Sequence, residues 1–115
     1  LGYAARLNGV TDLYINKCDL LHCYARTKDG TMPVVTEYEL DGKRIRYVPG
    51  TLAAQRRIAT VTTHVPIFAD DVSGVTSAKK LPGEFHALLT LMNEQLGCPV
   101  KAVGVGPGRE QLLEV

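Results

Sequence analysis

The sequence predicts an α/β fold: a mixed sheet with a β-hairpin and an amphipathic C-terminal helix. Three observations lead to this fold class. Apolar residues recur at helical spacing over residues 83–96. The dipeptide Asp41-Gly42 between two β-rich runs is typical of a two-residue hairpin turn. Residues 99–105 form a mostly apolar run, interrupted by Lys101, that is typical of a buried strand. The apolar stripe of the helix comprises Phe85, Leu88, Leu89, Met92 and Leu96.

The individual elements follow from local signals along the chain. Gly9 is placed to end a first helix, Pro66 limits the regularity of a β-rich run, and Gly97 is placed to end the long helix. In the first half we expect a helix over 1–8, a strand over 10–15, a turn or short helix over 19–22, a turn at 28–30, and hairpin strands over 34–40 and 44–48. In the second half we expect a short helix over 51–57, a β-rich run over 58–68, a loop over 70–74, the helix over 83–96, the strand over 99–105 and a turn at 106–108.

The bulk composition bounds the classes of function. The chain has 115 residues, enough for one domain or part of one, and its first residue is Leu1 rather than Met, which hints at an excised piece. A net charge of +1 gives no electrostatic case for nucleic-acid or membrane partners. The cysteines Cys18, Cys23 and Cys98 match no metal or redox spacing, so we expect reduced thiols in a cytoplasmic protein.

The most informative motif is Asn16-Lys17-Cys18-Asp19, which directly follows an apolar run. It reads N-K-x-D, the pattern with which GTP-binding proteins read guanine. A carboxylate such as that of Asp19 can accept hydrogen bonds from N1–H and the exocyclic amino group of guanine, each worth about 1.5–3 kcal/mol. The stem of Lys17 can lie over the base while its ammonium stays in water. A polar strand-to-turn junction is the alternative interpretation.

A second candidate wall of the same site is the glycine-rich turn Gly106-Pro107-Gly108, which follows the 99–105 strand. Glycine exposes backbone N–H and C=O groups to close approach by a flat ligand. If the two strands are neighbours, the turn and the tetrad form two walls of one base pocket. A plain turn is the alternative.

The sequence offers no catalytic or metal-binding constellation. No phosphate-binding G-x-x-x-x-G-K-[ST] motif is present, and His22, His64 and His86 are scattered outside any recognisable nucleophile motif. Asp70-Asp71 is interpreted as a solvated loop pair. We therefore expect a segment that can select a nucleotide without activating it.

Several ordered segments resemble the carboxyl-terminal part of the adenylosuccinate synthetase family. The resemblance covers nearly the whole chain. Its segments are Asn8-Gly9-Val10-Thr11, the tetrad with Leu20-Leu21, Tyr38-Glu39-Leu40-Asp41-Gly42-Lys43-Arg44-Ile45, Asp71-Val72-Ser73-Gly74-Val75, Leu81-Pro82 with the amphipathic helix, Gly97-Cys98-Pro99-Val100 and Gly106-Pro107-Gly108-Arg109-Glu110-Gln111.

The resemblance implies that residues 1–115 are the C-terminal guanine-nucleotide-binding portion of a larger P-loop-type GTP-dependent ligase fold. That family joins IMP and L-aspartate to give adenylosuccinate in purine biosynthesis, with GTP as co-substrate and Mg²⁺. It generally forms homodimers. By position, the resemblance assigns the guanine contacts to Lys17, Asp19, Gly104, Gly106 and Pro107, and the tetrad adds Asn16. It places the phosphate loop, catalytic residues and magnesium ligands before residue 1, so the chain alone is expected to be inactive.

The chain also departs from the family pattern. Asn16 stands where the family usually has Thr, Gly104 where Ser is common, and Gly108 where Asp is usual. Two alternatives to the enzyme hypothesis stay open. The chain could be a stand-alone, catalytically inactive module that binds a purine nucleotide or a protein, or a folded domain with a decayed pocket.

Overall fold

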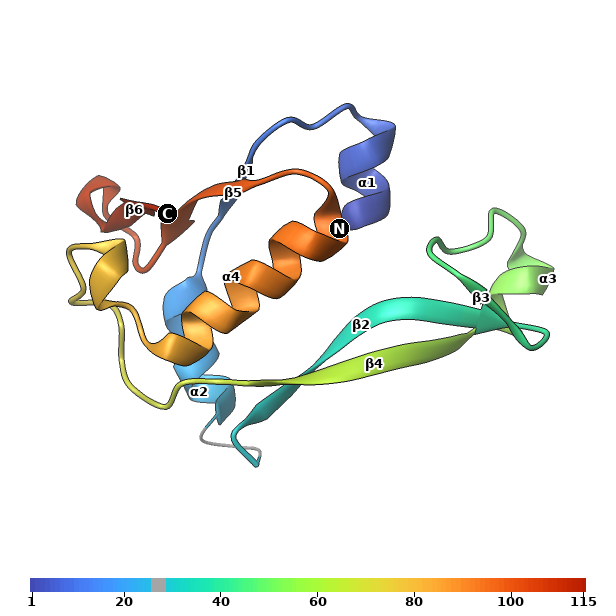
Figure 1. Ribbon diagram of the computed structural model, residues 1–115, viewed down its shortest axis with the longest axis horizontal. Helices are drawn as coiled ribbons and strands as arrows, with labels where there is room; N and C mark the ends of the chain where they lie inside the picture. The colour runs from blue at the N-terminus through green and yellow to red at the C-terminus, as the bar shows by residue number, and fades with distance from the viewer. Residues whose placement is uncertain (26–28) are drawn as a thin grey trace. The chain divides into compact units, whose positions relative to one another are not determined.

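The computed structural model describes residues 1–25 and 29–115. Within them the chain forms two compact units, one made of residues 1–32 and 65–115 and the other of residues 33–64 (Figure 1). Lys28, in the turn expected at 28–30, lies outside the described residues, whereas Gly30 has the positive φ of 68° that favours glycine.

The first unit contains a mixed three-stranded sheet, as the sequence predicts. Its strands are β1 (Leu13–Ile15), β5 (Val100–Gly104) and β6 (Leu112–Glu114), in the order β1-β5-β6. Strand β1 runs parallel to β5, and β6 runs antiparallel to β5. The expected strand over 10–15 is shorter than predicted, because the Val10 N–H bonds back to the carbonyl of Ala5 in the preceding helix.

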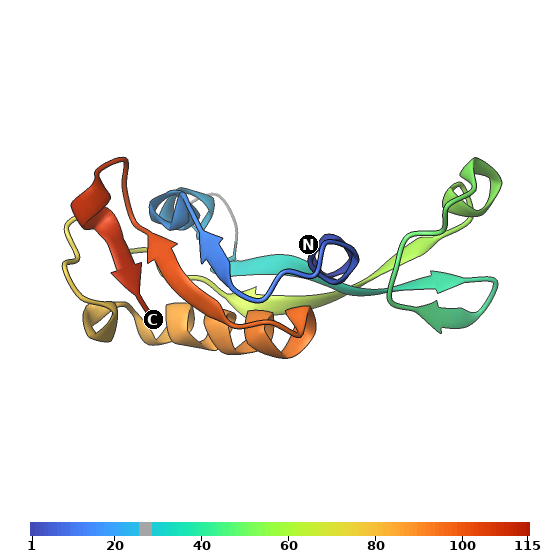
Figure 2. The same ribbon diagram turned by 90° about the horizontal axis from the view of Figure 1, so that it is seen from above.

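Helix α4 (Gly83–Leu96) has the predicted bounds and packs along this sheet (Figure 2). It ends at Gly97, whose φ of 71° lies in the left-handed region that glycine adopts at low cost. The four stripe residues Phe85, Leu88, Leu89 and Leu96 are buried, and Met92 is half-buried. The other helical segments of this unit are α1 (Gly2–Leu7), α2 (Leu21–Ala25), and the 3-10 turns η1 (Cys18–Leu20), η2 (Ala78–Lys80) and η3 (Arg109–Gln111).

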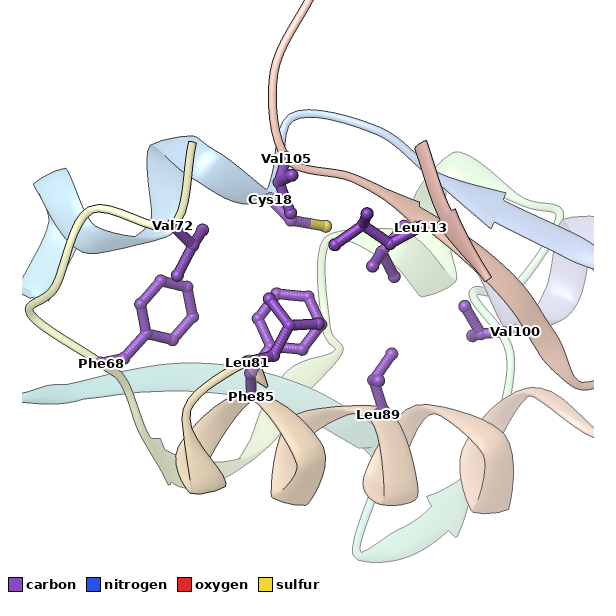
Figure 3. Packing of buried hydrophobic residues seen from close by; sticks show 10 residues of the cluster. Cys18, Phe68, Val72, Leu81, Phe85, Leu89, Val100, Val105 and Leu113 are labelled. Atoms are coloured by element: carbon purple, nitrogen blue, oxygen red, sulfur yellow. The ribbon is translucent and has the colours of Figure 1, made fainter. Parts of the chain in front are cut away.

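The main core lies between α4 and the ends of β1 and β5. Figure 3 shows Phe85 and Leu89 extending from α4 toward the sheet side of this core. Phe85 also packs against Phe68 with ring centroids 5.5 Å apart, a geometry worth about 0.5–1.5 kcal/mol beyond area burial. The buried members of the cluster are Cys18, Phe68, Val72, Leu81, Phe85, Leu89, Val100, Val103, Val105 and Leu113. The carboxyl ends of β1 and β5 are therefore fixed directly to the core.

The second unit is built on a hairpin. Strand β2 (Thr31–Leu40) lies between β3 (Lys43–Ile45) and β4 (Ala59–Pro66), and α3 (Leu52–Gln55) begins after the cap residue Thr51. Asp41 and Gly42 have φ values of 51° and 77°, and positive φ at both central residues is the requirement of a type I′ turn. Strand β3 ends at Ile45, shorter than the predicted 44–48. Residues 33–64 are all at least partly exposed, so the unit lacks a core of its own.

We predict that Phe85→Ala lowers the free energy of unfolding by about 3–5 kcal/mol, because Phe85 is 1% exposed and its removal leaves a cavity in the main core. Urea denaturation followed by circular dichroism measures the change. Leu52→Ala is the matched control, because Leu52 is 64% exposed and should shift stability by less than about 1 kcal/mol. Equal losses in the two variants would contradict the assigned core.

Candidate nucleotide-binding site

The tetrad and the strand before the glycine turn meet at one edge of the sheet. Strands β1 and β5 are parallel neighbours, with Ile15 paired to Val103. Asn16 directly follows β1 and Gly104 is the last residue of β5, so the two residues lie side by side where these strands end. Ligands of open α/β sheets bind at the carboxyl ends of strands. The neighbouring strands required for a two-walled site are therefore present.

Gly104 and Asn16 are in direct contact. A Cβ atom added at Gly104 would lie 2.9 Å from Asn16 Oδ1 and 3.4 Å from Asn16 Cα. Gly104 is buried and Asn16 is exposed. The Asn16 side chain thus occupies the space that a side chain at position 104 would need, which gives a physical reason for glycine there.

The tetrad has an inward and an outward side. Cys18 is 4% exposed, belongs to the main core and donates its S–H to the Ile15 carbonyl at 3.5 Å. Asn16 and Lys17 are exposed, and Asp19 is half-buried. Lys17 has φ 63° and ψ 31°, a left-handed conformation that is uncommon for a residue with a side chain. This backbone lets Cys18 enter the core while its polar neighbours remain accessible.

The environment of Cys18 keeps its thiol protonated. Burial, and secondarily the nearby charge of Asp19, raise the pKa of Cys18 to about 11. All three cysteines are free thiols. Cys18 therefore acts as an apolar anchor of the tetrad.

His22 lies three residues after Asp19 and contacts the tetrad. Its Nδ1 forms a hydrogen bond with the backbone carbonyl of Asp19, and since a carbonyl only accepts, Nδ1 carries the proton. Its Nε2 lies 3.3 Å from Cys23 Sγ. The other histidines lie elsewhere, His64 on β4 and His86 exposed on α4. The residues described here contain no group of three or more His, Cys, Asp or Glu side chains that could hold a metal ion.

The glycine turn is held by a side chain that the sequence analysis gave no role. Gln111 Oε1 accepts the Gly108 N–H at 2.8 Å, and Gln111 Nε2 donates to the Ser73 carbonyl at 2.8 Å. Pro107 is exposed at the tip of the turn. Among residues 1–25 and 29–115, no acceptor bonds the Gly106 N–H. The spacing of a glutamine three residues after a glycine-rich turn is the signal that could have identified Gln111.

One groove lies away from these residues. It has a volume of about 530 Å³ between α4, β5 and the end of the chain, and its polar lining includes His86, Asn93, Lys101 and Glu114. It contains neither tetrad nor turn residues. None of the helices within the described ranges combines the length and apolar character needed to cross a bilayer.

The fold and the shared strand edge define a protein of the α/β class with a mixed sheet. The family model described as adenylosuccinate synthetase matches residues 1–113. The chain therefore belongs to the adenylosuccinate synthetase family, as the sequence motifs indicate.

Relatives support the same assignment. The chain is 38% identical over 113 residues to an adenylosuccinate synthetase of Parafrankia sp. (strain EAN1pec) and 36% identical over 111 residues to that of Saccharopolyspora erythraea. These alignments cover 98% and 96% of this chain and 25% of each relative, so the chain spans about a quarter of their length. The fold matches a structure titled fully ligated adenylosuccinate synthetase from Plasmodium falciparum, with a TM-score of 0.86 at 16% identity, over 98% of this chain and 26% of that one.

We predict that Gly104→Ala destabilises the protein by about 1–3 kcal/mol, because the new methyl group collides with Asn16. In the double variant with Asn16→Ala, part of this loss should be recovered. A double-mutant cycle by urea denaturation measures the coupling. Gly50→Ala is the control, because open space surrounds a Cβ there. Strictly additive losses for Asn16 and Gly104 would contradict their contact.

We predict that the free energy of unfolding falls as pH rises from about 9 toward about 11, with a component that depends on Cys18. The unfolded thiol ionises near its ordinary value of 9.0, whereas burial holds the folded thiol protonated up to a pKa of about 11. High pH therefore favours the unfolded state. Urea midpoints of the wild type, Cys18→Ala and the exposed-thiol control Cys23→Ala, measured across this range, test it. The Cys18 variant should lose less stability than the other two, and identical slopes would contradict the account.

Proposed function

We propose that this chain is the guanine-nucleotide-binding portion of an adenylosuccinate synthetase, a GTP-dependent ligase that joins IMP and L-aspartate to form adenylosuccinate in purine nucleotide biosynthesis. The observation that supports this most directly is the pairing of β1 with β5 in a chain of this family, because it brings Asn16 and Gly104 side by side. Asn16, Lys17, Asp19, Gly104, Gly106 and Pro107 form the proposed site.

The proposed recognition rests on complementary hydrogen bonding to guanine. The Asp19 carboxylate accepts from N1–H and the exocyclic amino group, while the unbonded Gly106 N–H donates to O6. Adenine presents a lone pair at N1 and an amino group in place of O6, so both contacts would be unfavourable. The Lys17 stem covers one face of the base, and Pro107 offers an apolar edge to it.

In this proposal the chain recognises the guanine base, and the remaining three quarters of the enzyme carry out the ligase reaction. By family resemblance, Mg²⁺, IMP and aspartate would bind there. We assign no catalytic residue to this chain. By family resemblance the intact enzyme works as a cytoplasmic homodimer, without nucleic-acid or membrane partners.

We predict that Asp19→Asn lowers GDP affinity by at least about tenfold, because two charge-assisted hydrogen bonds to guanine are lost. The same variant should bind xanthosine diphosphate more tightly than the wild type, because the new amide can donate to the 2-carbonyl of xanthine. Isothermal titration of the protein with both nucleotides measures the effect.

Asp12→Asn is the matched control for this experiment, since Asp12 is an exposed carboxylate at the opposite end of β1, where it faces Lys101 at 4.0 Å. It should leave both affinities unchanged. Wild-type protein that prefers ADP to GDP, or an Asp19 variant with unaltered GDP affinity, would overturn the proposed guanine site.

A further inference from the structure

Gln111 connects two loops that are far apart in sequence. Its side chain accepts the N–H of Gly108 and donates to the carbonyl of Ser73, each at 2.8 Å. Its backbone also closes the turn, because the Gln111 N–H bonds to the Gly108 carbonyl at 3.1 Å and the Val105 N–H bonds to the Gln111 carbonyl at 2.9 Å. One half-buried residue therefore makes four hydrogen bonds around the glycine turn.

The position of this side chain accounts for Gly106. A Cβ added at Gly106 would overlap the Gln111 amide group. Gly106 has no positive φ, so backbone conformation does not demand glycine there. The Gln111 amide therefore lies directly against the backbone of Gly106.

The other end of the link is anchored in the core. Ser73 follows Val72, which is 1% exposed and belongs to the main cluster. The Ser73 N–H is itself held by Asp71 Oδ1 at 2.9 Å. The Ser73 carbonyl is thus an acceptor in a fixed position. Because Gln111 bonds to it and to Gly108, the glycine turn is held relative to the core.

We propose that Gln111 is a positioning residue for guanine recognition: it holds the Gly106–Gly108 turn, and with it the Gly106 N–H, at the strand edge that bears the tetrad. This inference rests on the proposed function. Gln111 acts through backbone groups and does not itself contact the nucleotide. Preorganised donors bind without the cost of ordering a loop, so loss of the link should weaken the ligand that uses the turn.

The test replaces Gln111 with methionine, which has similar length but forms neither hydrogen bond. Gln111→Met should weaken GDP binding about tenfold in isothermal titration, whereas ADP, which cannot pair its amino group with the Gly106 N–H, should bind as it does to the wild type. Hydrogen exchange of the Gly108 amide should accelerate. Gln95→Met is the matched control, because Gln95 is exposed on α4, and it should change neither affinity nor exchange.

Gln111→Glu tests the two side-chain hydrogen bonds one at a time, because it removes only the bond to Ser73. It also keeps the test valid if the methionine variant fails to fold. The carboxylate can still accept the Gly108 N–H but repels the Ser73 carbonyl. The Gly108 amide should then stay protected while GDP affinity falls and ADP affinity does not.

Folded variants that bind GDP within about twofold of the wild type would overturn the role of Gln111. An equal loss of GDP and ADP affinity would also overturn it, because a merely structural defect weakens both. If the wild type binds GDP and Asp19→Asn weakens that binding, either result with the Gln111 variants overturns only the positioning role of Gln111 and leaves the proposed guanine site in place. A wild type without GDP binding overturns the proposed function and this inference together.

Discussion

The parallel pairing of β1 with β5 is the constraint on which the rest of the site depends. It joins a strand near the start of the chain to one near its end, with Ile15 opposite Val103. Val103 is 0% exposed, and the core beneath it fixes the ends of both strands. A shift of this register by one residue would reverse which side chains enter the core. The tetrad and the glycine turn would then no longer share one surface.

Two glycines near this edge are explained by neighbouring side chains. The Asn16 side chain occupies the space beside Gly104 where a Cβ would lie, and the Gln111 side chain occupies that space beside Gly106. From the sequence alone, the bare backbone of the turn is explained by the approach of a ligand. The structure adds an internal cause, since a Cβ at either position would collide with a neighbouring side chain that would have to move.

Elements with strong periodic or turn signals were predictable, and those set by distant contacts were not. Helix α4 has the predicted bounds because its apolar stripe and Gly97 are local signals, and Asp41-Gly42 forms its turn for the same reason. Strand β6 has only three residues and is defined by its antiparallel pairing with β5. Because this pairing is a tertiary contact, no local pattern indicated the strand. The roles of Lys17 and Asp19 in binding remain predictions. The link from Gln111 to Ser73 spans 38 positions and required the structure.

We propose that the two strand ends form one guanine site. Amide chemical shifts of the protein, followed by NMR during a titration with GDP, test it most directly. The account predicts that the amides of Asp19 and Gly106 shift together, with one dissociation constant, and that an equal concentration of ADP leaves them unmoved. Shifts at only one of the two strand ends, or shifts that ADP reproduces, would contradict it.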